Sequence, residues 1–406
     1  MLWLWLGGPG LSISVGQEVI DEAALRNEDG RLLDNALVQM EATAAVNDMY
    51  NFKFEKAARQ FEWFREKYPD HPLPYFLLGL NQWWQIMPNS DVDTYDETFF
   101  GYMDLTIDKA RDLYQQDREN AEAAFFLAAA YAFKSRLNAE RKNWTKAIFN
   151  GKSALKFLRV GRANEELSPE LLLGDALYNY YSIWIPKNYP LLRPVLLLFK
   201  KGDQQLGLEQ LQKVAQEAFY TRTEAQYFLV RIFRSDENRP AEALPVAEYL
   251  ANTFPDNAYF QRTYASILYV LGQLDRLEMV SKQVLDKINQ AYPGYEAVSG
   301  RYASYFLGYV YRLRYKNLTQ AAYYYRQAVA FAEESQHQDS GYYHGALQQL
   351  AQYAVQAKDF TQARLYYQKL KDHSPKKSQY YKEANGWLKK NRPVSPKKNR
   401  QKRKKS

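Results

Sequence analysis

The sequence predicts an all-α fold, an α-solenoid built from about eight helical hairpins, and two recurring patterns carry this prediction. At three places an alanine is followed twelve residues later by a proline, with apolar or aromatic residues four and seven positions after the alanine. A small residue there lets two antiparallel helices approach closely, and the proline stops the second helix. The three pairs are Ala57 and Pro69, Ala243 and Pro255, and Ala363 and Pro375.

A Leu-Gly dipeptide is the second pattern, and it recurs where the first helix of a hairpin contacts the second. The glycines are Gly79, Gly174 and Gly308, each preceded by leucine. Apolar residues recur with helical periodicity from about residue 35 to about residue 390, with few interruptions. We therefore expect one elongated domain over residues 35–390, because each unit of a repeat array contacts only its neighbours.

The hairpins follow one another with short links, and a last amphipathic segment, 378–390, caps the open end of the stack. A polar lead-in covers residues 17–34. We predict hairpins at 35–69, 72–118, 121–160, a fourth that starts at residue 168, and then 223–255, 256–290, 295–334 and 341–375.

A proline-rich insertion, residues 184–203, is the largest departure from this pattern. It has prolines at 186, 190 and 194 and an apolar run at 195–199. The run is too apolar to lie free in water, so we expect the insertion to fold over the concave surface or over adjoining hairpins. Contact of this run with a membrane is the alternative.

Composition is that of a globular protein with a core, since 46% of residues are hydrophobic and 25% are charged. The chain has 34 tyrosines, which either fill the space between stacked hairpins or serve an interface. There is no cysteine. Disulfides, thiolate metal sites and a cysteine nucleophile are therefore excluded.

The net charge of +8 comes from the carboxyl-terminal end of the chain. Residues 389–406 hold ten Lys or Arg and no acid, and subtracting these ten from +8 leaves −2 for residues 1–388. We expect residues 391–406 to be a disordered basic tail. Such a tail makes weak contacts with any polyanion, or it serves only as a solubilising extension.

The amino terminus, residues 1–16, is an apolar leader of signal-peptide length that lacks the usual positive start. We favour export, to a bacterial periplasm or envelope, over a frayed apolar leader of a cytoplasmic protein. No other segment has the roughly 18 uninterrupted apolar residues of a transmembrane helix.

Enzyme signatures do not stand out. Gly151-Lys152-Ser153 resembles the end of a phosphate-binding loop, but that motif needs a glycine where this chain has Lys146. None of the four histidines makes the paired spacing of a helical zinc site. They are His71, His337, His344 and His373. We expect no catalytic residue, no metal and no cofactor.

These patterns together resemble the tetratricopeptide repeat family, and the resemblance covers most of residues 37–375. It implies a right-handed superhelix in which successive first helices line a concave face that binds peptides. Transferred to this chain, the groove positions of that family carry large aromatic residues and arginines. They are Phe76, Trp83, Phe125, Phe228, Tyr259, Arg262, Tyr269, Tyr302, Tyr305, Tyr309 and Arg312.

The groove residues have two interpretations, because a tyrosine stripe such as Tyr302, Tyr305 and Tyr309 either binds a partner or packs against the next hairpin. The turn at residues 68–72, Tyr-Pro-Asp-His-Pro, is in addition similar to turns of bacterial envelope repeat proteins. The resemblance thus implies a non-catalytic scaffold that binds a protein or peptide partner. The alternative is an anionic-surface or nucleic-acid binder that acts through the basic tail.

Overall fold

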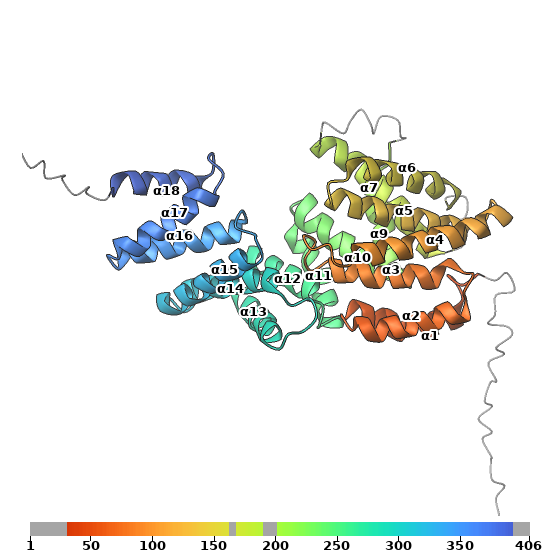
Figure 1. The fold of residues 1–406 in the computed structure, drawn as a ribbon, viewed down its shortest axis with the longest axis horizontal. Coiled ribbons are helices and arrows are strands. Elements are labelled where there is room, and N and C mark those ends of the chain that lie inside the picture. The colour runs from red at the N-terminus through yellow and green to blue at the C-terminus, as the bar shows by residue number, and fades with distance from the viewer. Residues whose placement is uncertain (1–30, 162–167, 190–200, 393–406) are drawn as a thin grey trace, which may run out of the picture.

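The protein is an all-α solenoid of stacked helical hairpins, as the sequence predicts (Figure 1). The computed structural model describes residues 31–161, 168–189 and 201–392. Within these ranges the chain has 17 α-helices and no strand. The predicted leader, most of the polar lead-in, the apolar run of the insertion and nearly all of the basic tail lie outside the described residues.

Each unit is a pair of helices that pack against each other. Units 1 to 4 comprise α1 (Ala36–Tyr50) with α2 (Phe54–Lys67), α3 (Pro72–Ile86) with α4 (Asp96–Gln116), α5 (Ala121–Glu140) with α6 (Trp144–Gly161), and α7 (Leu172–Asn188) with α9 (Gln204–Glu217). Units 5 to 8 comprise α10 (Arg222–Arg231) with α11 (Pro240–Thr253), α12 (Ala258–Val270) with α13 (Leu274–Asn289), α14 (Ala297–Leu313) with α15 (Leu318–Glu334), and α16 (Gly341–Gln356) with α17 (Phe360–His373). The chain closes with α18 (Gln379–Lys390).

Two short helical segments extend first helices of the stack. The 3₁₀ turn η2 (Pro169–Leu171) leads directly into α7, and the π-helical turn η4 (Ile232–Asp236) continues α10. The side chain of Ser168 accepts a hydrogen bond from the backbone N–H of Glu170 and so caps η2.

The alanine and proline of the repeat pattern lie at the contacts and ends of second helices. Ala57, Ala243 and Ala363 have no exposed surface. The helices α2, α11 and α17 end two residues before Pro69, Pro255 and Pro375. Each helix ends there because the proline ring disfavours the α conformation in the residue that precedes it.

The glycines of the Leu-Gly pairs lie where two helices meet. A Cβ atom built on Gly308 of α14 would lie 2.7 Å from the ring of Tyr325 on α15. Gly79 faces Met103 in the same way, and Gly174 faces Leu158. At Gly308 a larger residue would collide with a rigid ring, whereas at Gly79 and Gly174 the ends of the Met103 and Leu158 side chains would have to move.

The insertion starts later than the sequence pattern indicates. Residues 184–188 continue α7, which contains Pro186. Proline is tolerated near a helix end, where the lost N–H costs one hydrogen bond. The described edges of the insertion are therefore the end of α7 and residues 201–203.

The superhelix closes on itself between unit 1 and unit 6. The backbone N–H of Asp256 donates to the side chain of Asn51 at 2.8 Å, and the side chain of Asn257 donates to the carbonyl of Tyr50 at 2.8 Å. Trp84 of α3 also packs edge-on against Phe260 of α12, with 5.1 Å between ring centroids. Units 1 to 6 thus form a closed body, from which α14 to α18 extend as an arm (Figure 1).

Consecutive units pack less closely at one place. The second helix of each unit packs along the first helix of the next, except at the junction of α6 and α7, where the described residues show a much looser contact. Leu158 of α6 lies against Gly174 of α7 there. This opening in the stack leaves room for a cavity between units 3 and 4.

Candidate binding cavities on the inner face

Two cavities lie on the inner face, and the first helices of units 2 to 7 form most of their walls. The larger one, which we call the apolar cavity, has a volume of about 950 Å³ and is bounded by α3, α5, α6, α7 and α10. The smaller one, the arginine cavity, has a volume of about 440 Å³ and lies against α10, η4, α12 and α14. Arg136 of α5 lines both cavities.

Small residues on α5 and α6 create the apolar cavity. One face of α5 carries Ala124, Ala128 and Ala132, and α6 adds Gly151 and Ala154. Alanine favours the helix but leaves space that a leucine would fill. Aromatic rings of the neighbouring helices complete the walls; they include Phe76, Phe125, Phe157, Tyr181 and Phe228.

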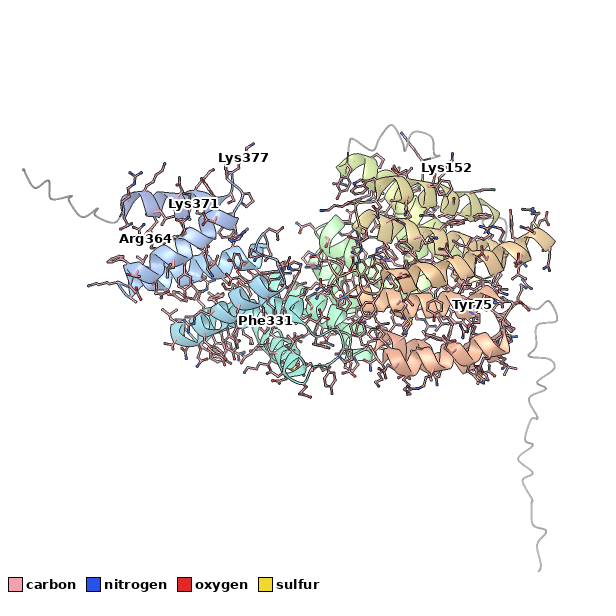
Figure 2. The ribbon with its side chains drawn as sticks, in the orientation of Figure 1. Tyr75, Lys152, Phe331, Arg364, Lys371 and Lys377 are labelled. Atoms are coloured by element: carbon pink, nitrogen blue, oxygen red, sulfur yellow. The ribbon has the colours of Figure 1, made fainter. Side chains whose placement is uncertain are left out.

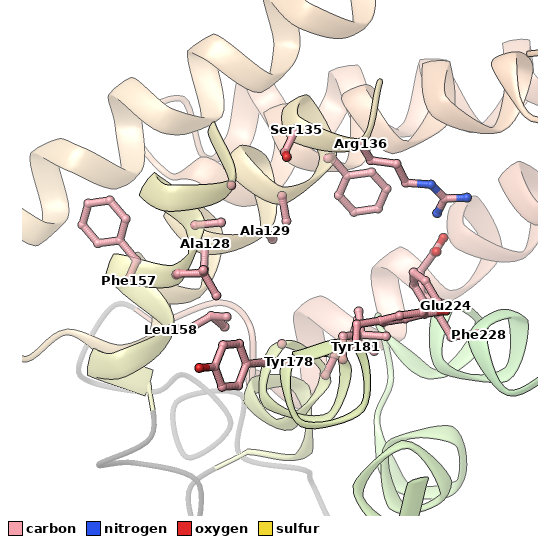
Figure 3. Close-up of a pocket in the computed structure, with 18 of the residues that line it drawn as sticks. Ala128, Ala129, Ser135, Arg136, Phe157, Leu158, Tyr178, Tyr181, Glu224 and Phe228 are labelled. Atoms are coloured by element: carbon pink, nitrogen blue, oxygen red, sulfur yellow. The ribbon is translucent and has the colours of Figure 1, made fainter. Parts of the chain in front are cut away.

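One end of the apolar cavity is polar. Figure 3 shows Arg136 and Glu224 pointing toward each other at this end, whereas Phe157, Leu158 and Tyr178 lie at the other. Glu224 accepts hydrogen bonds from the indole N–H of Trp84 at 3.0 Å and from the hydroxyl of Tyr50 at 3.4 Å. Its Oε2 atom has no hydrogen-bond partner among the described residues.

The charge state of Glu224 follows from its burial. Loss of solvation raises the pKa of this carboxyl, and the nearby Arg136 guanidinium partly opposes the rise. Arg136 itself lies over the ring of Trp83 at 4.7 Å and donates to the hydroxyl of Tyr227 at 2.5 Å. The Nε atom of Arg136 finds no partner among the described residues.

The arginine cavity gathers five arginines and one glutamate, Glu140. Tyrosine rings separate the guanidinium groups: Arg262 lies over Tyr259 and over Tyr302, both at 5.4 Å, and Arg301 lies over Tyr302 at 5.0 Å. The arginines are Arg136, Arg231, Arg234, Arg262 and Arg301.

The predicted groove residues fall into three places. Phe76, Phe125 and Phe228 line the apolar cavity, and Tyr259, Arg262 and Tyr302 line the arginine cavity. Trp83 is buried beside Arg136. The remaining four lie on the arm side of the inner face; they are Tyr269, Tyr305, Tyr309 and Arg312.

The arm-side residues pack among themselves. The ring of Tyr269 lies 4.8 Å from that of Tyr309 and 5.8 Å from that of Tyr305. Arg312 lies over Tyr309 at 5.5 Å. All four side chains are half-buried, so this surface combines packing between units 6 and 7 with some exposed ring area.

Several residues of the cavities have no counterpart in the sequence pattern. Arg231 and Arg234 come from unit 5 and Arg301 from unit 7, so the two segments are far apart in the sequence and meet only in the folded chain. A weak sequence pattern could have indicated Glu224. It is one of three buried glutamates that lie in, or just before, the first turn of the first helix of a hairpin. The other two are Glu122 and Glu170.

Groups that could hold a metal ion do not occur in the described ranges. Gly151, from the segment that resembles a phosphate-binding loop, lies in the middle of α6 and lines the apolar cavity. None of the described helices is long and apolar enough to cross a membrane. The cavities offer apolar surface, aromatic faces and guanidinium groups.

No family model matches the sequence, and no curated protein is similar to it at a significant level.

Proposed function

We propose that this protein is a non-catalytic scaffold of the tetratricopeptide repeat type, which holds a segment of a partner protein on its inner face. The apolar cavity is the observation that carries the proposal. Voids in packed cores seldom exceed the size of a water molecule, so a cavity of about 950 Å³ is not a packing defect. Its volume lies at the upper end of the range for ligand sites.

The position of the cavity also supports this function. Its walls are the first helices of units 2 to 5 together with α6, and three of the aromatic residues that the family resemblance assigns to the groove line it, namely Phe76, Phe125 and Phe228. Aromatic and apolar walls suit a partner segment with large apolar side chains. A backbone or side-chain polar group of that segment would meet Arg136 and Glu224.

The insertion bears on access to the cavity. Pro186 and Lys201, at its two described edges, both line the cavity, which agrees with an insertion that lies over the concave surface. The apolar run 195–199 lies outside the described residues, so the covering role of the insertion stays a prediction. The turn at residues 68–72 leads us to propose a bacterial envelope location as well.

A cavity-filling variant tests this function. Ala132 of α5 lines the apolar cavity and is exposed to it, so Ala132→Trp fills the binding space without removing any packed side chain. We expect the variant to lose the specific partner in a crosslinking pull-down from the native organism, with an unchanged circular dichroism spectrum.

Ala44→Trp is the matched control, since Ala44 is exposed on α1 and lines neither cavity. It should retain the partner. Equal partner recovery by both variants would show that the apolar cavity is not the binding site.

A further inference from the structure

The arginine cavity concentrates positive charge that the described part of the chain neutralises only in part, since Asp236 acts on Arg231 and Glu224 on Arg136. Five arginines face this space, and among the described residues Arg231, Arg234, Arg262 and Arg301 form no salt bridge. Other arginines of this protein are paired: Arg141 binds Asp96, and Arg314 binds Asp275.

Two of these arginines are buried. Arg301 retains 4% of its surface and Arg262 retains 9%. A buried charge ordinarily has an opposite charge beside it, because transfer out of water is costly. Burial lowers the pKa of both groups, and for Arg301 the neighbouring Arg262 lowers it further.

The acidic groups nearby do not balance this charge. Glu140 is the one carboxylate among the lining residues. Glu296 and Asp339 act on Arg262 and Arg301 only as weak, more distant charges. His337, which also lines the cavity, has its imidazole 3.2 Å from the carboxylate of Asp91.

Hydrogen-bond donors are left over in the same place. The Nε and Nη1 atoms of Arg301 and the Nε atom of Arg136 are buried and have no partner among the described residues. Arg262 is held in position, since its Nη1 donates to the carbonyl of Pro88 at 3.0 Å and to Ser299 at 3.2 Å. The cavity therefore offers fixed guanidinium groups with free donors.

We propose that the arginine cavity binds the phosphate group of a small ligand. Guanidinium groups match the geometry and charge of phosphate oxygens through paired N–H donors. A dianionic group suits this site better than a single carboxylate, because several arginines converge on it. The volume of about 440 Å³ leaves room for a phosphate and a modest organic group beside Tyr259 and Tyr302. This ligand goes beyond the scaffold function.

The two cavities share a wall, so the phosphate group could belong to either of two kinds of ligand. Arg136 lines both cavities, so a phosphate held in the arginine cavity lies next to apolar space. The ligand is either a free phosphorylated molecule or the headgroup of a lipid whose acyl chain enters the apolar cavity. The two sources share the same recognition chemistry and differ in what fills the apolar cavity.

Calorimetric titration of the full chain with inorganic pyrophosphate at low salt tests the site. We expect saturable binding that Arg234→Gln weakens at least about tenfold, the effect of losing one charge-assisted contact. Arg234 is half-buried, so this variant should fold. Arg301→Gln should give a similar or larger loss if it folds. Arg314→Gln, which removes an arginine outside the cavity, should bind as the parent chain does.

Three further ligands complete the test. Phosphatidic acid distinguishes a lipid from a free phosphorylated molecule, and citrate and an acidic peptide test whether the site prefers phosphate. Short-chain phosphatidic acid that binds more tightly than pyrophosphate, with the gain abolished by Ala132→Trp, would identify a lipid headgroup. Equal affinity of the two would identify a free phosphorylated molecule. The proposal is overturned if pyrophosphate shows no saturable binding, if Arg234→Gln and Arg314→Gln bind alike, or if citrate or an acidic peptide binds as tightly as pyrophosphate.

Discussion

Three buried glutamates show how single residues hold the solenoid together. Glu170 accepts hydrogen bonds from the backbone N–H groups of Tyr220 and Thr221 at 3.0 and 2.9 Å, and from the Thr221 hydroxyl at 2.6 Å. Glu122 accepts from the N–H groups of Leu32 and Leu33. These two carboxylates thus satisfy backbone donors of segments far away in the sequence. The third, Glu224, accepts instead from the side chains of Trp84 and Tyr50.

Replacement of Glu170 should be strongly destabilising. Glu170→Ala leaves several buried N–H groups before α10 without an acceptor, so we expect the free energy of unfolding to fall by about 3 kcal/mol. Chemical denaturation measures the change. Glu217→Ala, on the exposed face of α9, should change the free energy by less than about 0.5 kcal/mol. Equal effects of the two would contradict the anchoring role.

A second single residue, His344, makes the stability of the fold depend on pH. It is buried, and burial lowers its pKa below the ordinary 6.5, while its Nε2 lies 3.0 Å from the carbonyl oxygen of His373. The unfolded chain therefore binds more protons than the folded chain in the window below pH 6.5. Stability contributed by neutral His344 is complete above pH 6.5 and is lost as pH falls through the folded pKa.

Thermal unfolding of His344→Gln against the parent chain checks this sign. We expect the midpoint of the parent chain to fall more steeply than that of the variant between pH 7.5 and pH 5.5. Parallel pH profiles would show that His344 does not protonate on unfolding.

Close contacts between the two helices of a hairpin set the distance between them. Gly308→Ala places a methyl group 2.7 Å from the ring carbons of Tyr325. We expect a loss of about 1–3 kcal/mol from overpacking, although alanine favours the helix by about 1 kcal/mol. Chemical denaturation of the variant gives the sign and size of the effect.

Gly341 is the matched control for this substitution. It begins α16, and a Cβ atom there meets nothing within 4 Å. Gly341→Ala should leave the unfolding free energy unchanged or slightly higher. If Gly308→Ala were equally harmless, the close contact between α14 and α15 would not be a constraint on sequence.

The helical hairpins could be predicted because their signals are local. Prolines such as Pro69 and Pro255 lie just beyond helix ends, and Ala57 lies at a helix contact within the same unit. The end of α7 was harder to predict, since Pro186 marks a break in the sequence pattern yet lies inside the helix. A proline in the last turn of a helix leaves the preceding hydrogen bonds intact.

The closed body of the molecule could not be read from the sequence. Its contacts, such as Asn51 with Asp256, join residues 205 positions apart, and no local pattern indicates them. The predicted groove residues are therefore divided between two cavities, the buried Trp83 and an arm-side surface. Phe76 and Trp83 are buried against aromatic rings of neighbouring helices, Phe76 against Phe126 and Trp83 against Phe99 and Phe133.

Closure of the body predicts a long-range effect of a single side chain. Asn51→Ala removes the acceptor for the backbone N–H of Asp256, and we expect the free energy of unfolding to fall by about 1–2 kcal/mol. Hydrogen exchange should become faster at residues 256–260 as well as near the substitution. Faster exchange confined to unit 1 would show that the two units are not coupled.

The basic end of the molecule lies far from the cavities. Figure 2 shows Arg364, Lys371 and Lys377 at the end of the arm, close to where the described part of the chain stops. The basic tail itself lies outside the described residues. A tail that binds polyanions is thus separate from the inner face, and removal of residues 393–406 should leave cavity binding unchanged.

The account rests most on the claim that the apolar cavity receives a segment of another protein. A photo-crosslinking amino acid at position 132, in the cavity, and at position 44, on the outer face of α1, compares the two surfaces directly in cells of the native organism. We predict a defined crosslinked band at position 132, in which mass spectrometry identifies a second protein, and no such band at position 44. Crosslinks from position 132 that reach only residues of this same chain would contradict the claim.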